Sequence, residues 1–337
     1  MFKISYVSQQ PLKGDSPSVF IKEDDEKEYR VEFINNNEKI IKYVKSNQYV
    51  YGGYQYYKDW IIHIYHNNQL VWVNTYTPKD QVIFIKMDSK ALGDTIAWIE
   101  YVEEFRIKHK CKIICSTFFN ELFVDVYPNI LFVQPNTVIQ NIYAQYYIGA
   151  SDSGNIYYSP IKTSYHPLQK TATEILGLDY TEKRPQLEIN VINTKPKIDG
   201  KYICLSEYGS NPKKMWKGDW QKVVDFIIEK GYKVVVISKE KTSLKNIIDK
   251  SGDYPLYERM IDIYHSEFFI GISSGLSWLA YGLNKHVVMI SDTTPSFHEF
   301  SGNITRLNKN NLEYVDYEIN DFLSTDDVIN NEFFQTL

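Results

Sequence analysis

The chain of 337 residues is 43% hydrophobic and 23% charged, a composition typical of a globular protein with room for two or three domains. Its net charge of −5 and the lack of a long basic block argue against nucleic acid as the main partner. No segment approaches the roughly 20 apolar residues of a membrane span, and the N-terminal residues do not form a signal peptide, so we expect a cytoplasmic protein.

Residues 1–80 are expected to form a small antiparallel β domain. The runs that alternate polar with apolar residues, as half-buried strands do, are 29–34, 40–44 and 48–51. Residues 60–65 and 70–73, separated by an asparagine turn, predict a hairpin, and residues 77–80 mark the end of the domain. The sequence does not decide between a binding platform and a scaffold for this domain.

From Val82 the pattern changes to alternating strands and helices, which is typical of a parallel, doubly wound sheet. A β-branched and aromatic run over 82–86 leads into apolar residues at helical spacing from Leu92. The join places Gly93 and Asp94 at the carboxyl end of a strand, where open α/β sheets bind ligands. Asp94 could therefore be a general base, a helix cap or a first-turn acid that complements the helix dipole.

The remaining elements predict a second α/β half after a linker over residues 183–200. The first half is completed by a strand over 111–116, a short helix over 118–127, strands over 130–133 and 145–149, and a helix capped by Gly177. The second half has predicted strands over 201–206, 233–238, 268–271 and 287–291, and helices over 220–230, 260–266 and 274–281. A last helix is expected near 326–334.

We therefore expect an α/β protein with two Rossmann-like domains facing a cleft, preceded by a small antiparallel β domain. We predict a β domain over 1–80, an N-terminal Rossmann-like domain over 81–190, a C-terminal Rossmann-like domain over 191–322 and a C-terminal helix or tail over 323–337. Nucleotide-sugar transferases, periplasmic binding proteins and several epimerases share two such halves, so the fold alone does not select a function.

A small-residue turn lies between the predicted strand over 268–271 and the helix that follows it. The backbone N–H groups of Ser274, Gly275 and Leu276 would point out of the helix start, where a phosphate is stabilised by the dipole and by unsatisfied donors. Gly275 would let the phosphate approach the backbone closely. The alternative is a capped helix packed against its strand.

Two further positions follow predicted strands of the second half. Lys213 and Lys214 come after the strand over 201–206, where a lysine can neutralise a diphosphate, although one of the pair can simply be solvated. Glu240 follows the next strand and could hydrogen-bond a ribose.

The cysteines and histidines do not indicate a metal site. Cys111, Cys115 and Cys204 cannot all pair, and small buried thiols are favoured over a metal pair or a redox pair. The histidines have no recognisable ligand spacing, and Asp292 and Glu299 add none. The sequence also lacks a P-loop, a nucleophile elbow and a dinucleotide-binding glycine fingerprint.

Several motifs together resemble those of one glycosyltransferase family. They are residues 87–98 with 101–105, 115–118, 214–216, 238–240, 271–278 and 287–291. In these motifs, over about residues 82–300, the chain resembles the bacterial autotransporter O-heptosyltransferases, which are relatives of the lipopolysaccharide heptosyltransferases. The first and last motifs are specific.

The resemblance implies a metal-independent glycosyltransferase of the two-Rossmann (GT-B) type that uses a nucleotide-diphosphate heptose such as ADP-heptose and needs no other cofactor. It implies a protein serine or threonine hydroxyl as the acceptor, held in part by the N-terminal β domain. By resemblance, Asp94 is the catalytic base. The implied donor-binding residues are Gly93, Lys214, Trp216, Ser238, Glu240, Ser273, Ser274, Gly275 and Leu276.

One departure from the family is the absence of cysteine after Cys204, because family members hold iron with a C-terminal cysteine cluster. We therefore expect no iron, no large assembly built on that cluster, and a diverged branch with a different acceptor or sugar. The alternative functions are a glycosyltransferase acting on a DNA base, lipid or glycan, and a non-catalytic nucleotide-sugar-binding protein.

Overall fold

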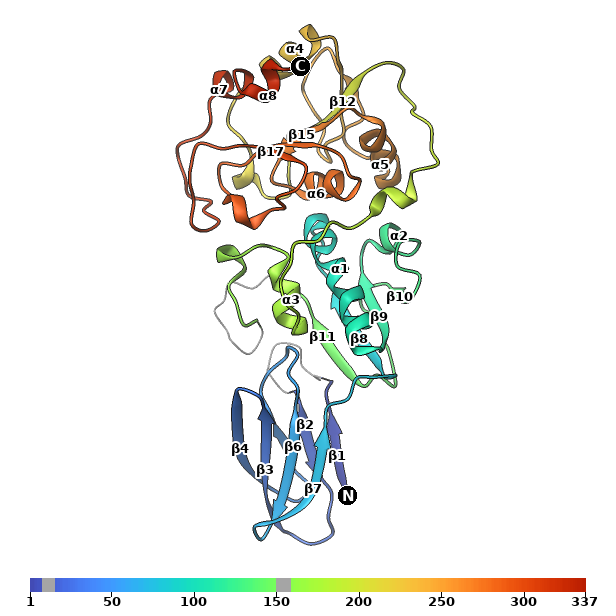
Figure 1. The fold of residues 1–337 in the computed structure, drawn as a ribbon, viewed down its shortest axis with the longest axis vertical. Helices are drawn as coiled ribbons and strands as arrows, with labels where there is room; N and C mark the ends of the chain where they lie inside the picture. The colour runs from blue at the N-terminus through green and yellow to red at the C-terminus, as the bar shows by residue number, and fades with distance from the viewer. Residues whose placement is uncertain (8–15, 150–158) are drawn as a thin grey trace.

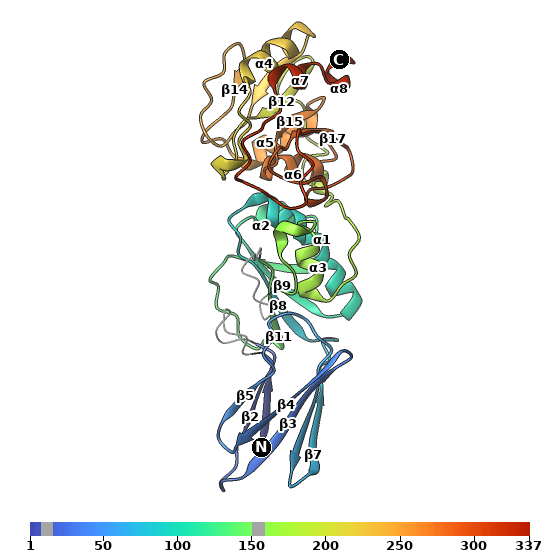
Figure 2. The same ribbon diagram turned by 90° about the vertical axis from the view of Figure 1, so that its left-hand side faces the viewer.

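The computed structural model describes residues 1–7, 16–149 and 159–337, which are arranged in three tiers along one long axis (Figures 1 and 2). An antiparallel β region lies at one end, a four-stranded parallel sheet with its helices lies in the middle, and a six-stranded parallel sheet lies at the other end. The expected α/β architecture with a preceding antiparallel β region is confirmed. No helix in the described ranges has the length and apolarity needed to cross a membrane.

The N-terminal tier contains two antiparallel sheets. The first has the order β1-β2-β5, with β1 (Phe2–Ser5), β2 (Ser18–Ile21) and β5 (Tyr49–Tyr51). The second has the order β4-β3-β6-β7, with β3 (Glu28–Asn35), β4 (Glu38–Lys45), β6 (Ile61–His66) and β7 (Gln69–Thr75). The predicted hairpin is confirmed as the pair β6–β7, whereas β1 and β2 were not anticipated from the sequence.

Alternation along these strands builds a shared core. Four apolar side chains are fully buried: Val31 and Phe33 on β3, and Ile62 and Ile64 on β6. The residues between them, Glu32 and His63, are polar. Val31 lies opposite Ile64 and Phe33 opposite Ile62 in the register, so the buried side chains pair across the two strands.

The middle tier is a parallel sheet with the order β10-β9-β8-β11. Its strands are β8 (Val82–Met87), β9 (Lys112–Thr117), β10 (Ile130–Val133) and β11 (Ala144–Tyr147). Its helices are α1 (Leu92–His109), α2 (Asn120–Phe123) and α3 (Lys170–Leu176). Gly177 ends α3 in the left-handed region at φ 63°, as expected from the sequence.

Helix α1 is the central helix of this tier. Trp98, Tyr101 and Phe105 on it are completely buried. The Trp98 indole N–H donates to the Leu168 carbonyl at 3.0 Å, and the Tyr101 hydroxyl donates to the Gln169 side chain at 2.9 Å. These bonds join α1 to the start of α3.

The C-terminal tier is a parallel sheet with the order β14-β13-β12-β15-β16-β17. Its strands are β12 (Tyr202–Ser206), β13 (Lys233–Val236), β14 (Ile248–Asp249), β15 (Phe269–Ile272), β16 (Val287–Ile290) and β17 (Ile304–Leu307). Its helices are α4 (Trp220–Glu229), α5 (Leu256–His265), α6 (Gly275–Gly282), α7 (Thr325–Ile329) and α8 (Glu332–Gln335).

Three expected elements differ from the structure. The helix expected over 118–127 is only the four residues of α2, followed by a turn over 124–126. The strand expected to close the second sheet is followed by β17, which forms its edge. The single terminal helix is two helices, because the side chain of Asn331 caps α8 by accepting from the Phe333 N–H at 3.0 Å.

The C-terminal residues pack onto the six-stranded tier. Val328 on α7 and Phe334 on α8 are fully buried, and the Phe334 ring lies edge-on to Phe226 of α4 at 6.3 Å between centroids. The tail is thus part of the core of this tier.

We expect Phe334→Ala to lower the free energy of unfolding by about 3–5 kcal/mol, because it removes a fully buried aromatic ring and leaves a cavity. The measurement is chemical denaturation monitored by tryptophan fluorescence. Glu332→Ala, at an exposed position of the same helix, is the control and should change stability by less than about 0.5 kcal/mol. A loss below about 1 kcal/mol in the Phe334 variant would show that the tail is dispensable for this core.

Candidate active site

The site lies where the N-terminal ends of α1 and α6 meet, one helix from each parallel tier (Figure 1). Helix α1 follows β8, and helix α6 follows β15, so both starts lie at carboxyl ends of strands. The first four N–H groups of a helix have no partner within the helix. Two helix starts facing one another therefore bring unsatisfied donors and the positive ends of two helix dipoles together.

Glycines allow this close approach. A Cβ atom on Gly275 would lie 2.8 Å from Leu92 Cβ and 3.0 Å from the Gly93 nitrogen. A Cβ atom on Gly93 would lie 3.0 Å from Trp278 and 3.3 Å from Gly275 Cα. Leu92 therefore occupies the space on the Cβ side of Gly275, and the expected approach of a phosphate to the Gly275 backbone stays a prediction.

Asp94 lies in the first turn of α1 and is half-buried. The Ser89 hydroxyl donates to its Oδ2 at 2.8 Å, and no Lys, Arg or His of the described residues forms an ion pair with it. The helix cap position is Ala91, so Asp94 does not serve as the cap. Its carboxylate retains an oxygen that can accept a proton.

The electrostatic surroundings of Asp94 come from both tiers. Burial raises the pKa of its carboxyl group above the ordinary 3.8, the Ser89 hydrogen bond and the Lys214 charge lower it, and the Glu299 charge raises it. Lys214 and Glu299 belong to the C-terminal tier, so Asp94 lies within electrostatic reach of residues from across the meeting point.

A hydrogen-bond network centres on Ser273, a buried residue between β15 and α6. The Lys214 ammonium donates to Ser273 Oγ at 3.3 Å, and the Thr294 hydroxyl also donates to it at 3.3 Å. The Ser273 hydroxyl in turn donates to Oε1 of Glu299. Lys213, the exposed neighbour, instead forms an ion pair with Glu318. The structure thus directs Lys214 toward Ser273 and directs Lys213 to the surface.

Two buried polar atoms at this place have no hydrogen-bond partner among the described residues: Ser274 Oγ and Glu299 Oε2. Ser274 is the cap residue of α6, in extended conformation, and its hydroxyl makes no capping bond. Because buried polar groups are almost always hydrogen-bonded, these atoms are candidates for contact with a ligand. Leu276, in the first turn of α6, is half-buried and contributes a helix-start N–H.

Trp216, which is expected to bind the donor, packs into the core of the C-terminal tier. Its indole N–H donates to the Leu323 carbonyl at 2.7 Å, and its ring lies edge-on to Trp220 at 4.9 Å. The ring is also 94% buried in the core of the C-terminal tier. Both the ring and its N–H donor are engaged in these contacts, and the expected role of Trp216 in donor binding stays a prediction.

Ser238 and Glu240, both expected to bind the donor, have different surroundings after β13, and their roles stay predictions. Ser238 is fully buried, accepting from the Glu207 N–H at 3.1 Å and donating to Ser206 Oγ at 3.3 Å, while Glu240 is exposed. Glu207, which the sequence reasoning missed, directly follows β12. Its Oε1 accepts from Thr242 at 2.7 Å, and its buried Oε2 has no partner within the described residues.

Glu207 is therefore a buried carboxylate at a carboxyl strand end, and burial raises its pKa. Glu207 could have been recognised in the sequence because it immediately follows an apolar strand, as Asp88 follows β8. Ser238 holds the Glu207 backbone, so its influence on any ligand would act through Glu207.

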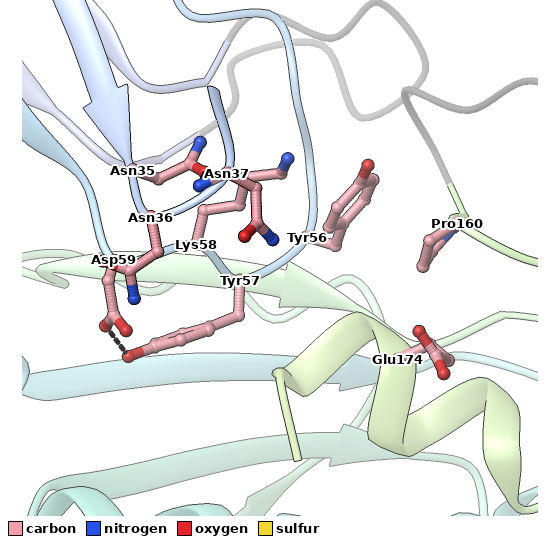
Figure 3. Close-up of a pocket in the computed structure, with 9 residues that line it drawn as sticks. All are labelled: Asn35, Asn36, Asn37, Tyr56, Tyr57, Lys58, Asp59, Pro160 and Glu174. Atoms are coloured by element: carbon pink, nitrogen blue, oxygen red, sulfur yellow. Dashed lines mark hydrogen bonds between the residues drawn. The ribbon is translucent and has the colours of Figure 1, made fainter. Parts of the chain in front are cut away.

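A separate polar cavity of about 340 Å³ lies between the N-terminal and middle tiers (Figure 3). It is lined by residues 35–37 of the β3–β4 turn, residues 56–59, Pro160 and Glu174 of α3. The Tyr57 hydroxyl points to the Asp59 carboxylate and donates to it. None of the residues around Asp94 lines this cavity.

Two parallel α/β tiers whose helix starts meet in this way have the GT-B glycosyltransferase fold. The chain aligns with the structure of the dodecameric, iron-containing heptosyltransferase TibC of Escherichia coli in complex with ADP-D-beta-D-heptose. The TM-score is 0.78 at 23% identity, over 90% of this chain and 81% of that one. The E. coli ADP-heptose lipopolysaccharide heptosyltransferase II aligns with a TM-score of 0.52 at 11% identity, over 69% and 92%.

Sequence comparison finds relatives that are named autotransporter heptosyltransferases. The chain is 34% identical to the autotransporter heptosyltransferase Aah of E. coli over 236 residues, 66% of this chain and 60% of Aah. It is 30% identical to E. coli TibC over 238 residues, 66% of this chain and 57% of TibC. The match to the inactive autotransporter heptosyltransferase BimC of Burkholderia thailandensis is 26% over 261 residues, 73% and 61%.

These comparisons confirm the resemblance to the autotransporter heptosyltransferases. The matches span about 60% of the length of these curated relatives. No protein-family model matches the chain.

The residues present do not fit an iron site of the thiolate type. Cys111, Cys115 and Cys204 are free and buried, and burial raises the pKa of each thiol, to about 11 for Cys111. Thiolates are the metal-binding form, so these environments disfavour metal binding. The parts of the chain that the structure describes also contain no group of three or more His, Cys, Asp or Glu side chains placed to hold a metal ion. That the protein contains no iron remains a prediction.

We expect Gly275→Ala to destabilise the protein by about 1–3 kcal/mol, because the added Cβ would overlap Leu92 and the backbone of Gly93. Thermal unfolding followed by circular dichroism measures the effect. Gly302→Ala is the matched control, since its Cβ would have its nearest neighbour, Tyr281, at 3.7 Å. Equal stability of the two variants would contradict the close contact between the helix starts.

Proposed function

We propose that the protein transfers a heptose-like sugar from a nucleotide-diphosphate donor to a protein serine or threonine hydroxyl, with inversion at the anomeric carbon. The observation that carries this proposal is the meeting of Asp94 from one tier with Lys214, Ser273 and Ser274 from the other. A carboxylate that can accept a proton and a cation with helix-start donors that can hold an anion are the two groups that such a displacement needs.

In the proposed reaction, the acceptor oxygen attacks the anomeric carbon on the face opposite the diphosphate. The new bond joins this oxygen to the anomeric carbon, and the bond between that carbon and the phosphate oxygen breaks. The ionised Asp94 carboxylate takes the acceptor proton, and Ser89 holds the carboxylate in place through its 2.8 Å bond. The electron pair of the broken bond leaves with the nucleoside diphosphate.

Lys214 and the N-terminal N–H groups of α6 would stabilise the negative charge that develops on the diphosphate. Lys214 already lies against Ser273 at 3.3 Å, so a modest rotation of its flexible side chain would reach an anion at this helix start. Gly93, Gly275 and Leu276 contribute the close approach of the helices and the free backbone donors. Glu207, rather than the exposed Glu240, is our candidate for binding the ribose.

The identity of donor and acceptor is proposed from the relatives. TibC binds ADP-D-beta-D-heptose, and Aah and TibC are named autotransporter heptosyltransferases, which supports ADP-heptose as donor and a protein hydroxyl as acceptor. The polar cavity beside the N-terminal tier supports a role for residues 1–80 in holding the acceptor. The unpaired, buried thiols are consistent with a reducing, cytoplasmic location.

A second candidate is a non-catalytic nucleotide-sugar-binding protein. The relative BimC is described as inactive and still aligns over 73% of this chain. A binder of this kind would retain the anion-holding groups of α6 without using Asp94. Release of ADP from ADP-heptose by the wild-type protein in the presence of acceptor would exclude it.

We expect Asp94→Asn to lower turnover by about 10²–10⁴-fold, because the amide cannot accept the acceptor proton. The measurement is release of ADP from ADP-heptose together with mass spectrometry of a candidate adhesin acceptor. Affinity for ADP, measured by calorimetry, should stay within about twofold of the wild-type value, as should the melting temperature.

The pH profile provides the check on this role. The raised pKa of Asp94 means that activity should fall with decreasing pH at values above the ordinary 3.8 of an aspartate, since only the ionised form is a base. Near-normal turnover in the asparagine variant would remove Asp94 from this role.

We expect Lys214→Gln to lower kcat/KM about 10²–10³-fold, because it removes the cation nearest to the proposed diphosphate position. Lys213→Gln is the matched control. That lysine is exposed and paired with Glu318, so its loss should change kcat/KM by less than about fivefold. Steady-state kinetics with ADP-heptose measures both, and equal effects of the two substitutions would contradict the assignment.

A further inference from the structure

Glu299 is a buried carboxylate that the proposed reaction does not yet use. It lies in the segment between β16 and β17, directly after the short 3-10 helix Ser296–His298, and is 95% buried. Its Oε1 accepts from the Ser273 hydroxyl, while its Oε2 has no hydrogen-bond partner among the described residues. A buried carboxylate oxygen without a hydrogen bond lowers the stability of the fold, so we expect a second donor to bind this oxygen.

The nearest cations do not supply this donor. Arg306 influences Glu299 by its charge, but its guanidinium donates to the Phe300 carbonyl at 2.7 Å and contacts the Met289 sulfur at 3.8 Å. Lys214 donates to Ser273 and forms no ion pair with Glu299 within 4 Å. The buried Oε2 of Glu299 therefore lacks a donor among the described residues, and a hydroxyl of a bound ligand could supply one.

The surroundings of Glu299 indicate which part of a bound sugar nucleotide it would contact. It shares Ser273 with Lys214, and its charge raises the pKa of Asp94, so it is close to both the proposed anion-binding group and the proposed base. A carboxylate repels a diphosphate, but it is a strong acceptor for hydroxyl groups. In a sugar nucleotide, the part that is bonded to the leaving phosphate and carries several hydroxyl groups is the transferred sugar.

We propose that Glu299 is a specificity-determining residue whose Oε2 accepts a hydrogen bond from a hydroxyl of the donor sugar. This inference rests on the proposed function and deepens it by assigning one residue to the sugar. The unpartnered Ser274 hydroxyl lies next to Ser273 and adds a second polar group that a polyhydroxylated sugar could meet. In this arrangement Lys214 and the α6 N–H groups bind the diphosphate, and Glu299 binds a hydroxyl of the sugar.

The test compares two probes, ADP-D-beta-D-heptose and ADP, by calorimetry with the full-length protein. We expect Glu299→Met, which keeps the length of the side chain and removes both acceptors, to weaken binding of the sugar nucleotide about 10–100-fold. Binding of ADP should stay within about twofold. Glu299→Gln, the closer replacement, should show a smaller loss in the same direction and serves if the methionine variant does not fold.

The control is Glu318→Gln, an exposed carboxylate of the same tier, which should leave both affinities unchanged. Equal weakening of ADP and sugar nucleotide would overturn the inference, because Glu299 would then act on the diphosphate through Ser273. Unchanged binding of both probes would overturn it as well. If the wild-type protein binds neither probe, the proposed function itself fails, which distinguishes the two failures.

Discussion

The contact between the starts of α1 and α6 is the constraint on which the rest of the structure depends. Each helix follows a strand of a different parallel sheet, and the two backbones approach until a single Cβ atom at Gly275 would overlap Leu92. Such close approach requires glycine and gives the two halves a defined separation at this point. That separation brings Asp94, on one side, within electrostatic reach of Lys214 and Glu299, on the other.

Near this contact, negatively charged side chains outnumber the lysine that lies closest to them, and this arrangement determines which groups the site can bind. Two carboxylates, Asp94 and Glu299, share the neighbourhood of one lysine, Lys214. Lys214 bonds to a neutral hydroxyl rather than to either carboxylate, which leaves its charge available for an anion. Burial makes both the attraction and the repulsion stronger than they would be in water. A bound diphosphate would add the negative charge that a free lysine and two helix starts can stabilise.

Sequence reasoning correctly placed several candidate site residues at the joins between strands and helices. Gly93, Asp94 and the turn from Ser273 to Leu276 were expected at carboxyl strand ends, and the structure places them there. It did not identify the side chains that find a partner far along the chain. Trp216 bonds to Leu323, 107 residues away, so a residue of a motif that suggested donor binding is held in the core. Glu207 was overlooked in favour of Glu240 because both follow strands and only burial separates them.

The sequence by itself determined the alternation of strands and helices after Val82, the antiparallel character of the N-terminal β region and the position of Asp94 at a helix start. These features follow from local periodicity, from turn residues and from glycine, all of which act between near neighbours. Only the tertiary structure decided that Lys214 rather than Lys213 turns inward and that Glu299 joins Ser273. Those pairs are 59 and 26 residues apart, and their meeting depends on the order of β12, β15 and β16 in the sheet. Strand order arises from packing of the whole tier, which no local pattern encodes.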